Sequence, residues 1–317
     1  MKETDAPSQY YAPIILIGFN RPEHLKKTIS ALARNKGAKE SNLYCYIDGA
    51  LNSDDVRSQK TIVHIVNDRL NDFKSVSIIQ REVNFGLAKN IIEAVTEVVE
   101  KYGKVIVLED DIVTSNAFLT FMNDALEYYE QEDKVWHIAA YSEVNFEQRQ
   151  NEIFLCRYMS CWGWATWFNR WQYFEKDADL LIEEFSEDTI KKFDVDSNWG
   201  QVVANAQNKI NTWAVFWYAT IFKQGGLCVN PYFSHASNIG LDGSGVHSLA
   251  DEKRTLKQPL NHHGKFIGKA EIVEDLEALS VMRKAYLPKK NIRYYVLKFI
   301  TIFVSKETLK KLLKKSQ

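Results

Sequence analysis

The fold of this chain is decided by one short stretch, Pro13-Ile14-Ile15-Leu16-Ile17-Gly18-Phe19-Asn20-Arg21-Pro22. Residues 14–17 form a continuous apolar run, which is the pattern of a strand covered on both faces, as in parallel sheets. Pro22 suits the first turn of a helix, and Leu25, Ile29 and Leu32 then recur at helical spacing. The stretch therefore predicts a central strand that passes directly into a helix.

The alternation of strand and helix continues along the chain. Strands are predicted over 43–47, 76–79 and 105–108, and helical stretches over 56–70 and 87–102. Such alternation predicts right-handed βαβ crossovers and an α/β fold with a mostly parallel central sheet flanked by helices. In such sheets, ligands bind at the carboxyl ends of the strands. The predicted strand ends carry Asn20, Arg21, Asp48, Asn84, Glu109, Asp110 and Asp111.

The three adjacent acids Glu109, Asp110 and Asp111 follow the predicted strand 105–108. Adjacent carboxylates repel one another, and Mg²⁺ or Mn²⁺ relieves that repulsion while water and substrate phosphates complete its coordination. Such a metal would bridge a diphosphate and neutralise the charge on a leaving nucleotide. The alternative is an acidic helix start, because a cap within 114–116 would place these acids near the helix dipole.

Two further loops are predicted at the same edge of the sheet. The segment 84–90 places Gly86 at a tight turn from strand to helix. The cation of Lys89 and the amide of Asn90 project from the first helical turn, where they suit contact with phosphate or ribose. Asp48 ends the second strand, and its carboxylate suits the edge of a uracil or guanine base, although Asp48-Gly49 is also a common turn. The coincidence of these loops favours a metal-assisted nucleotide site over the acidic helix start.

Four motifs together resemble the nucleotide-sugar-binding half of GT-A glycosyltransferases: the stretch 13–22, Asp48-Gly49, Asn84-x-Gly86 and Leu108-Glu109-Asp110-Asp111. They are most similar to bacterial sugar transferases related to N-acetylglucosaminyltransferase I, and the resemblance covers roughly residues 12 to 250. It implies a Rossmann-like GT-A domain, Mn²⁺ or Mg²⁺ as cofactor, and a nucleotide-diphosphate-sugar of the UDP or GDP type as donor.

The resemblance also implies roles for single residues. Asp111 would coordinate the metal, whereas Glu109 and Asp110 would contact ribose or the donor sugar. Asp48 would contact the base, and Arg21 would lie near the nucleotide or diphosphate. The remaining residues assigned to the donor are Asn20, Asn84, Gly86 and Lys89.

An aromatic segment, Trp162-Gly163-Trp164-Ala165-Thr166-Trp167, resembles a tryptophan-rich motif of the same bacterial transferases. Because the apolar faces of sugar rings pack on indole rings, Trp162 and Trp164 are predicted to bind the acceptor. Core packing is the alternative for any one of these rings. We expect one ring at the site and the others in the core.

A glycine-rich loop, 237–247, contains Asp242 and His247. Loops of this kind often close over a ligand, and His247 is either a further metal ligand or a surface histidine. An inverting transfer needs a base that takes the proton of the acceptor hydroxyl. Asp242 is the leading candidate, with Asp196 and Glu143 as alternatives. The segment 212–218, which corresponds to the base-bearing segment of the eukaryotic relative, contains no acid, so a catalytically weak homologue stays open.

Composition excludes several classes of protein. With 40 basic and 41 acidic residues, the chain has no general affinity for nucleic acid, and 45% hydrophobic residues argue against disorder. The four cysteines lack the spacing of a zinc site and are interpreted as reduced thiols. The N-terminus lacks the apolar core of a signal peptide, and no apolar run is long enough to span a bilayer, so we expect a cytoplasmic protein.

One GT-A domain is predicted over 1–274, with a nucleotide-sugar half, 12–140, and an acceptor half, 141–274. A basic helical tail follows over 275–317. Within 291–304 the apolar residues share one helical face beside basic residues, which is typical of a helix lying on an anionic membrane. The alternative is a helix docked on the domain with solvated lysines.

The predicted function is metal-dependent transfer of a hexosyl or N-acetylhexosaminyl group, with inversion, to a glycan or polyprenol-linked acceptor in bacterial surface polysaccharide synthesis. A sugar nucleotidyltransferase is one alternative, although it would usually carry a glycine-rich basic loop after the first strand. A non-enzymatic glycan-binding module is the other, and it would leave the coincidence of Asp48, Asn84 and Asp111 unexplained.

Overall fold

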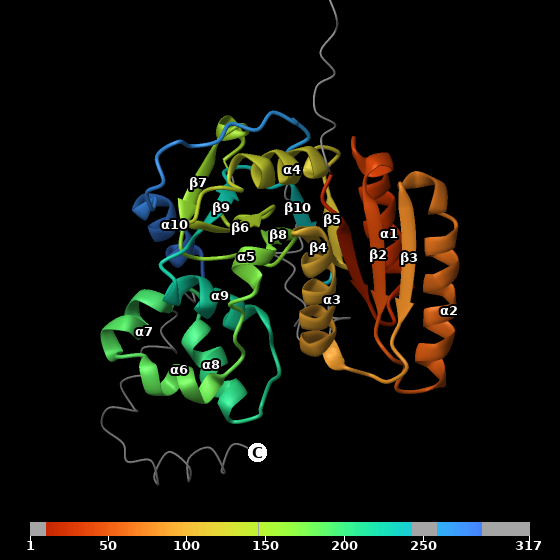
Figure 1. The fold of residues 1–317 in the computed structure, drawn as a ribbon, viewed down its shortest axis with the longest axis horizontal. Helices are drawn as coiled ribbons and strands as arrows, with labels where there is room; N and C mark the ends of the chain where they lie inside the picture. Colours follow the sequence, from red (N-terminus) through yellow and green to blue (C-terminus); the bar gives the residue numbers. More distant parts are fainter. Residues whose placement is uncertain (1–10, 145, 243–258, 287–317) are drawn as a thin grey trace, which may run out of the picture.

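The computed structural model describes residues 11–144, 146–242 and 259–286 (Figure 1). Its centre is an eight-stranded sheet with the order β3-β2-β1-β4-β8-β6-β9-β7, and a two-stranded sheet pairs β10 with β5. Helices cover both faces of the large sheet. The predicted α/β fold with a mostly parallel central sheet is therefore confirmed.

The first half is a parallel βαβ array. Its strands are β1 (Ile14–Gly18), β2 (Asn42–Ile47), β3 (Ser75–Gln80) and β4 (Lys104–Glu109). They alternate with α1 (Pro22–Ala33), α2 (Ser53–Asn67) and α3 (Gly86–Tyr102). Each strand predicted in this half is present, every residue of β1 is buried, and Pro22 opens α1 as expected.

The two faces of this array are covered by different helices. Side chains of α1, α2 and α4 (Phe118–Tyr128) pack with Ile14, Leu16 and Leu108 on one face. Side chains of α3 pack with Ile15, Ile17 and Val107 on the other. Because neighbouring residues of a strand point to opposite faces, the continuous apolar runs serve both layers.

The strand order reverses between β1 and β4. The chain runs from β1 outward through β2 and β3, and then returns to place β4 on the other side of β1. Ligands of open α/β sheets bind at such a switch point, beyond the carboxyl ends of the strands. Arg21 follows β1 and the acidic cluster ends β4, so the switch point carries the residues on which the functional prediction depends.

The second half extends the sheet with strands of both directions. Strand β8 (Trp164–Trp167) is antiparallel to both β4 and β6 (Val135–Ala139). Strand β9 (Leu227–Pro231) is parallel to β6, and β7 (Ile153–Cys156) is antiparallel to β9. Strands β4 and β6 therefore end at the same edge of the sheet, and β8 begins there between them.

The other elements complete the layers. The small sheet pairs β5 (Ile112–Thr114) with β10 (Ala236–Asn238) just after the acidic cluster. Figure 1 shows α6, α7 and α8 gathered at the lower left, with α9 above them. The remaining bounds are η1 (Ala38–Glu40), η2 (Leu70–Asp72), η3 (Glu147–Arg149), α5 (Phe168–Trp171), α6 (Ala178–Glu184), α7 (Glu187–Phe193), α8 (Asn198–Ala206), α9 (Ala214–Lys223) and α10 (Leu276–Tyr286).

The last described helix, α10, packs into the main core through Ala278, Leu279 and Met282. Just before it, the Asp275 N–H donates to the Leu155 carbonyl at 2.7 Å. The predicted division after residue 274 falls inside this packed region. The predicted membrane helix over 291–304 lies outside the described residues, and within the described residues no helix is long and apolar enough to cross a membrane. All four cysteines are free thiols.

Candidate functional site

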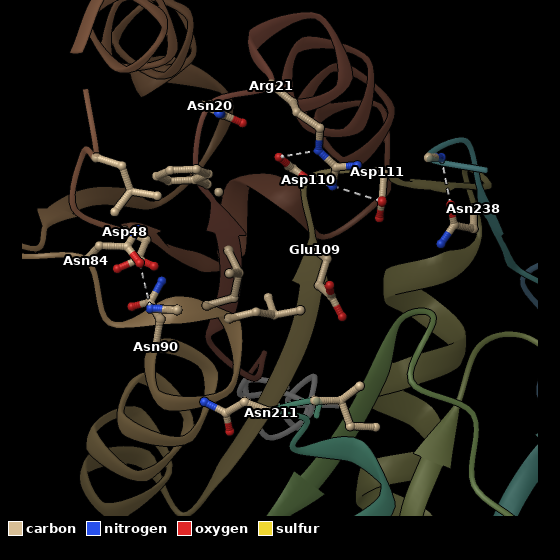
Figure 2. A pocket seen from close by; sticks show the side chains of 18 of the residues that line it. Asn20, Arg21, Asp48, Asn84, Asn90, Glu109, Asp110, Asp111, Asn211 and Asn238 are labelled. Carbon is tan, nitrogen blue, oxygen red and sulfur yellow. Dashed lines mark hydrogen bonds and ion pairs between the residues drawn. The ribbon is translucent and has the colours of Figure 1, made fainter. Parts of the chain in front are cut away.

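A cavity of about 890 Å³ opens at the carboxyl ends of β1 to β4, a volume typical of small-molecule sites (Figure 2). The segments that follow β1, β2, β3 and β4 supply one wall, and the segments 205–211 and 238–241 supply others. The predicted site residues that line it are Asn20, Arg21, Asp48, Asn84, Gly86, Glu109, Asp110, Asp111 and Trp162. Tertiary packing thus brings most of the predicted donor residues to one place.

The acidic cluster is held by one guanidinium group, as Figure 2 shows. Arg21 forms an ion pair with Asp110, its Nε donates to Asp110 Oδ2 at 3.3 Å, and its Nη2 donates to Asp111 Oδ2 at 2.9 Å. The Thr28 hydroxyl donates to the Asp110 carbonyl at 2.7 Å, and the Ile239 N–H donates to the Asp111 carbonyl at 2.9 Å. Both carboxylates are therefore oriented through their backbone as well as through Arg21.

Burial and mutual repulsion control the charge of this cluster. Burial, together with the negative charges of Asp111 and Asp110, raises the pKa of Glu109 to about 8. Burial also raises the pKa of Asp110 to about 6, although the Arg21 guanidinium opposes that shift. Burial and the neighbouring carboxylates therefore favour the neutral form of Glu109, whereas the Arg21 guanidinium favours the charged form of Asp110.

The donor set fits a divalent cation that shares its coordination with a substrate. Within the described residues, no group of three or more His, Cys, Asp or Glu side chains is arranged to hold a metal ion alone. Mg²⁺ and Mn²⁺ are commonly held by one or two carboxylates with phosphate oxygens and water completing the sphere. Glu109 and Asp111 line the cavity and could supply such carboxylates, because a bound cation would lower the pKa of Glu109 and favour its charged form. His247 lies outside the described residues.

Asp48 and Asn84 clamp two loops together at the other end of the cavity. Asp48 Oδ1 accepts the Gly49 N–H at 2.9 Å and the Phe85 N–H at 2.7 Å. The Asn84 amide donates to the Gly49 carbonyl at 2.7 Å. The backbones cross so closely that a Cβ on Gly49 would lie 2.1 Å from the Val83 carbonyl carbon. Asp48-Gly49 is thus both a turn and part of the cavity wall.

Asp55 orients Asn20 and was missed by sequence reasoning. Its Oδ1 accepts the Asn20 side-chain amide at 2.8 Å, and its Oδ2 accepts the Leu51 N–H at 3.0 Å. The sequence Asn52-x-x-Asp55 could have indicated this role, because it resembles a capping box. Asn52 caps α2 and accepts the Asp55 N–H, while the Asn52 amide donates to the carboxylate of Asp55 at the third helical position.

Asn90 lines the cavity, where the sequence predicts that its amide contacts phosphate or ribose. It is fully buried on α3, and its Oδ1 accepts the Arg81 Nε–H at 3.1 Å. Its Nδ2 has no hydrogen-bond partner among the described residues. A buried amide left without a partner is costly, so this donor is available to a ligand.

Lys89 does not reach the cavity. Its Nζ lies 3.6 Å from Glu93 Oε1 and 4.1 Å from the centroid of the Phe85 ring, and the side chain is 57% exposed. The helical turn that begins at Gly86, where φ is +72°, rotates Lys89 outward. The predicted turn is confirmed, whereas Lys89 lies apart from the other donor residues.

The wall opposite the acidic cluster was also missed. It carries amides and cations from α8 and the segment after it: Asn205, Asn208, Lys209 and Asn211, together with Lys176. Asn208 has the left-handed φ of 53°, which is uncommon for a residue other than glycine. The run Asn205 to Asn211 is rich in amides, but nothing local in the sequence indicates which cavity it faces.

Only one of the two predicted acceptor tryptophans lies at the cavity. Trp162 lines it, with its ring 4.4 Å from that of Tyr141. Trp164 is 1% exposed and stacks on Trp213 at 5.1 Å. A ring that is buried to this degree packs the core, so the assignment of Trp164 to the acceptor is corrected. One ring at the cavity and the others buried is the arrangement that we expected.

The carboxylates proposed as bases lie in different places. Asp242 does not line the cavity; its side chain is 45% exposed, with Oδ2 3.1 Å from His24 Nε2. Glu143 and Asp196 line a second cavity, which shares Trp162 with the first. The structure therefore favours the two alternative candidates over Asp242 by position.

No protein-family model matches the sequence, and a search of curated proteins found no match. Among solved structures, the fold is similar to residues 1–349 of TarS from S. aureus (TM-score 0.35, 13% identity, 49% of this chain and 47% of that chain). It is also similar to the mannosyltransferase PcManGT from Pyrobaculum calidifontis in complex with GDP-Man and Mn²⁺ (TM-score 0.37, 10% identity, 63% of this chain and 53% of that chain). A third similar structure is the galactosyltransferase LgtC in complex with donor and acceptor sugar analogs (TM-score 0.39, 11% identity, 88% of this chain and 98% of that chain).

The match spans about half the length of the first two of these chains. At these TM-scores the similarities carry no conclusion about what this protein does. The relation to N-acetylglucosaminyltransferase I stays a prediction.

Proposed function

We propose that this protein is a metal-dependent glycosyltransferase that binds a nucleotide-diphosphate-sugar in the large cavity. The observation that carries the proposal is the convergence of the segments after β1, β2, β3 and β4 at the switch point of the sheet. Asp48 lies at one end of the cavity, and Arg21 with the acidic cluster lies at the other. A donor of this class has a base at one end, then a ribose, then a diphosphate. The base would therefore lie near Asp48 and the diphosphate near the acidic cluster.

Asp48 and Asn90 supply complementary groups for the base. Of the two carboxylate oxygens of Asp48, Oδ1 alone has hydrogen-bond partners among the described residues. Oδ2 can therefore accept an N–H from the edge of uracil or guanine. The unpartnered Asn90 amide can donate to a carbonyl oxygen of the base or to a ribose hydroxyl. These two groups support a UDP or GDP donor.

Asp111 and Glu109 would hold Mn²⁺ or Mg²⁺ at the other end. When bound, such an ion neutralises negative charge on the diphosphate and on the leaving nucleotide. Lys176 and Lys209 supply positive charge on the opposite wall, where anionic groups of the donor are attracted to them. Arg21 keeps Asp110 and Asp111 in one orientation before the donor arrives.

The finer parts of the proposal concern the transferred group and the acceptor. We propose transfer, with inversion, of a hexosyl or N-acetylhexosaminyl group to a glycan or polyprenol-linked acceptor that packs on Trp162. A part in bacterial surface polysaccharide synthesis, at the cytoplasmic face of the membrane, rests on the family resemblance and on the basic segment 291–304, which lies outside the described residues.

Calorimetric titration tests the proposal. UDP-, GDP- and CMP-sugars are titrated with and without Mn²⁺ into the full chain, into Asp111→Asn, and into a surface control, Asp188→Asn, on α7. We expect one nucleotide class to bind in the presence of Mn²⁺, a loss of at least about tenfold in affinity for Asp111→Asn, and no change for the control. Binding that is independent of metal, or no binding by any nucleotide sugar, would show that the proposal is wrong.

Two further measurements separate the alternative functions. Release of pyrophosphate from a nucleoside triphosphate and a sugar phosphate would identify a nucleotidyltransferase. Binding of glycans without any nucleotide, abolished by Trp162→Ala, would identify a glycan-binding module.

A further inference from the structure

A second cavity, of about 180 Å³, lies beside the donor cavity and shares Trp162 with it. Its wall combines the rings of Tyr141, Tyr158 and Trp162 with the carboxyl groups of Glu143 and Asp196. Aromatic rings pack on the C–H faces of sugars, and carboxylates accept hydrogen bonds from their hydroxyl groups. The wall therefore suits one sugar residue of an acceptor.

We infer that Glu143 is the catalytic base of the transfer, taking the proton of the acceptor hydroxyl in this second cavity. The inference rests on the proposed function, because it requires that the sugar donor occupy the large cavity. It replaces Asp242, the leading candidate from the sequence, which is exposed and lines neither cavity.

The register of the sheet aligns the ends of β4 and β6, the strands whose following segments line the two cavities. Trp164 pairs with Val107 of β4 on one side and with Ala139 of β6 on the other. Two residues beyond this row, toward the same edge, lie Glu109, Trp162 and Tyr141. The pairing continues past the strands, because the Ala140 N–H donates to the Gly163 carbonyl at 2.8 Å.

Glu143 lies four residues beyond Ala139, the last residue of β6, and two residues beyond Tyr141. Neighbouring strands lie about 4.8 Å apart, so the ends of β4 and β6, separated by β8, are about 10 Å apart. This spacing leaves room for one sugar ring between a diphosphate at the acidic cluster and the segment 141–143, which follows β6 and lines the second cavity. The Trp162 ring lies between the two cavities and is the surface over which the donor sugar and the acceptor meet.

The backbone on both sides of Glu143 is fixed by hydrogen bonds. The Ser142 N–H donates to the Ser234 hydroxyl at 3.1 Å, and the Val144 N–H donates to the Ser142 hydroxyl at 3.1 Å. Ser142 and Val144 are both buried, whereas Glu143 between them is half-buried at the cavity. Catalytic groups need such support, because small displacements from the reacting atoms are costly.

Asp196 is positioned differently and has a different role. It lies on the turn between α7 and α8, outside the sheet, where Ser197 has the left-handed φ of 54°. The Asn198 side chain accepts the N–H groups of Val195 and Asp196 at 3.1 and 2.9 Å. This turn directs Asp196 into the second cavity from the helical layer, where it holds acceptor hydroxyls away from the reacting centre.

The acceptor hydroxyl oxygen forms a bond to the anomeric carbon of the donor sugar while the Glu143 carboxylate takes its proton. The bond between the anomeric carbon and the diphosphate oxygen breaks, and its electron pair leaves with the nucleoside diphosphate. The products are the glycoside, the nucleoside diphosphate and protonated Glu143.

Release of nucleoside diphosphate tests the inference in the full chain, with Mn²⁺ and the UDP- or GDP-sugar that binds in calorimetry. The acceptors are water and a panel of methyl hexosides. We expect Glu143→Gln to lower the turnover number by about 10²- to 10⁴-fold, which is the usual contribution of a general base. Its melting temperature and its dissociation constant for the nucleotide sugar should match those of the unaltered protein, as should those of Asp188→Asn.

Chemical rescue distinguishes a lost base from a disturbed cavity. Azide attacks without losing a proton, so sodium azide should restore nucleotide release by Glu143→Ala and yield the glycosyl azide. Asp196→Asn should instead raise the Michaelis constant for the methyl hexoside, with no azide rescue.

Turnover by Glu143→Gln at the unaltered rate would overturn the inference, and so would azide rescue of Asp196→Asn in place of Glu143→Ala. Either result leaves nucleotide-sugar binding intact, so it contradicts only the assignment of the base. Failure of the unaltered protein to bind any nucleotide sugar contradicts the proposed function and this inference together.

Discussion

Gly240, beside the acidic cluster, has no space for a side chain. Gly240 follows β10 and packs directly against the carboxylate and the guanidinium of the cluster: a Cβ built there would lie 2.1 Å from Asp111 Oδ2 and 3.0 Å from Arg21 Nη1. The sequence places Gly240 in a glycine-rich loop of the kind that closes over a ligand. The close approach gives it a more specific role, because only a residue without a side chain lets the loop reach Asp111.

Gly240→Ala should therefore damage the site without damaging the fold. The added methyl group displaces Asp111 from Arg21, and we expect Mn²⁺-dependent affinity for the nucleotide sugar to fall at least about tenfold, or about 1.4 kcal/mol. Calorimetry and a thermal melt measure the two effects. The matched control is Gly200→Ala on α8, where a Cβ meets nothing within 4 Å and should stabilise the helix by up to about 1 kcal/mol. Unchanged affinity in Gly240→Ala would contradict the close contact.

Two buried histidines make the stability of the protein depend on pH. Burial lowers the pKa of His137 and of His235 to about 3. The hydrogen bonds of His137 suit a neutral ring, with Nε2 3.0 Å from the Ser160 carbonyl and Nδ1 accepting from the Trp217 indole at 3.2 Å. Between pH 3 and the unfolded value of about 6.5, the unfolded chain binds more protons, so the free energy of unfolding falls as the pH falls through this window.

Replacing His137 should reduce this pH dependence. Between pH 7.5 and pH 5, one such histidine accounts for a loss of about 2 kcal/mol, at about 1.4 kcal/mol per pH unit below 6.5. His137→Gln should therefore lose about 2 kcal/mol less than the unaltered protein over this interval in urea unfolding. The exposed His64 on α2 is the control, since His64→Gln should leave the difference unchanged. An equal loss in His137→Gln and the unaltered protein would show that His137 is not buried as a neutral ring.

At the scale of elements, the tryptophan-rich segment places a cavity-lining ring, Trp162, only two residues before a core ring, Trp164. Trp162 precedes β8 and faces the cavities, while Trp164, inside β8, stacks in the core with His137 and Trp213. The two rings come from one sequence motif, yet the position of β8 between β4 and β6 gives them different surroundings.

Alanine substitutions should therefore have opposite signatures. Trp164→Ala should lower the free energy of unfolding by about 3–5 kcal/mol, because it leaves a large cavity in the core. Trp162→Ala should stay near the stability of the unaltered protein but reduce turnover with methyl hexoside acceptors. Urea unfolding and nucleotide release measure the two effects. Equal destabilisation by both changes would remove Trp162 from the acceptor surface.

The loops that carry the donor residues were predictable because their signals are local. The apolar runs of β1 and β4, Pro22 at the start of α1 and Gly86 at the start of α3 each act within a few residues of themselves. Once these strands are parallel, their carboxyl ends meet at one edge. Lys89 is the exception, since the direction of a side chain in the first helical turn depends on how the turn is entered.

For the whole molecule, the C-terminal region has two parts. Helix α10 belongs to the packed domain, with Ala278, Leu279 and Met282 in the main core, and Arg157 forms an ion pair with Glu274 just before it. The basic segment predicted to lie on a membrane begins later in the chain. A test of membrane binding must therefore remove the chain after Tyr286 and keep α10.

Two truncations separate these parts. A chain that ends at Tyr286 should keep its melting temperature and lose flotation with vesicles of phosphatidylglycerol, because the basic residues that attract anionic lipid are gone. A chain that ends at Asp275 should lose on the order of 5 kcal/mol of stability, since three buried side chains leave the core. Unchanged flotation of the chain ending at Tyr286 would remove the membrane prediction.

The sequence by itself determined the parallel array of β1 to β4 and the donor loops at its edge, because chain direction, apolar run length and turn residues are set by near neighbours. Tertiary structure alone decided which aromatic ring is buried, that the segment 205–211 forms the opposite wall, and that Glu143, and not Asp242, lines the second cavity. These outcomes depend on β8 entering the sheet antiparallel between β4 and β6, which joins residues far apart in the chain. Long-range pairing of this kind is set by the packing of the whole core, and no short stretch of sequence encodes it.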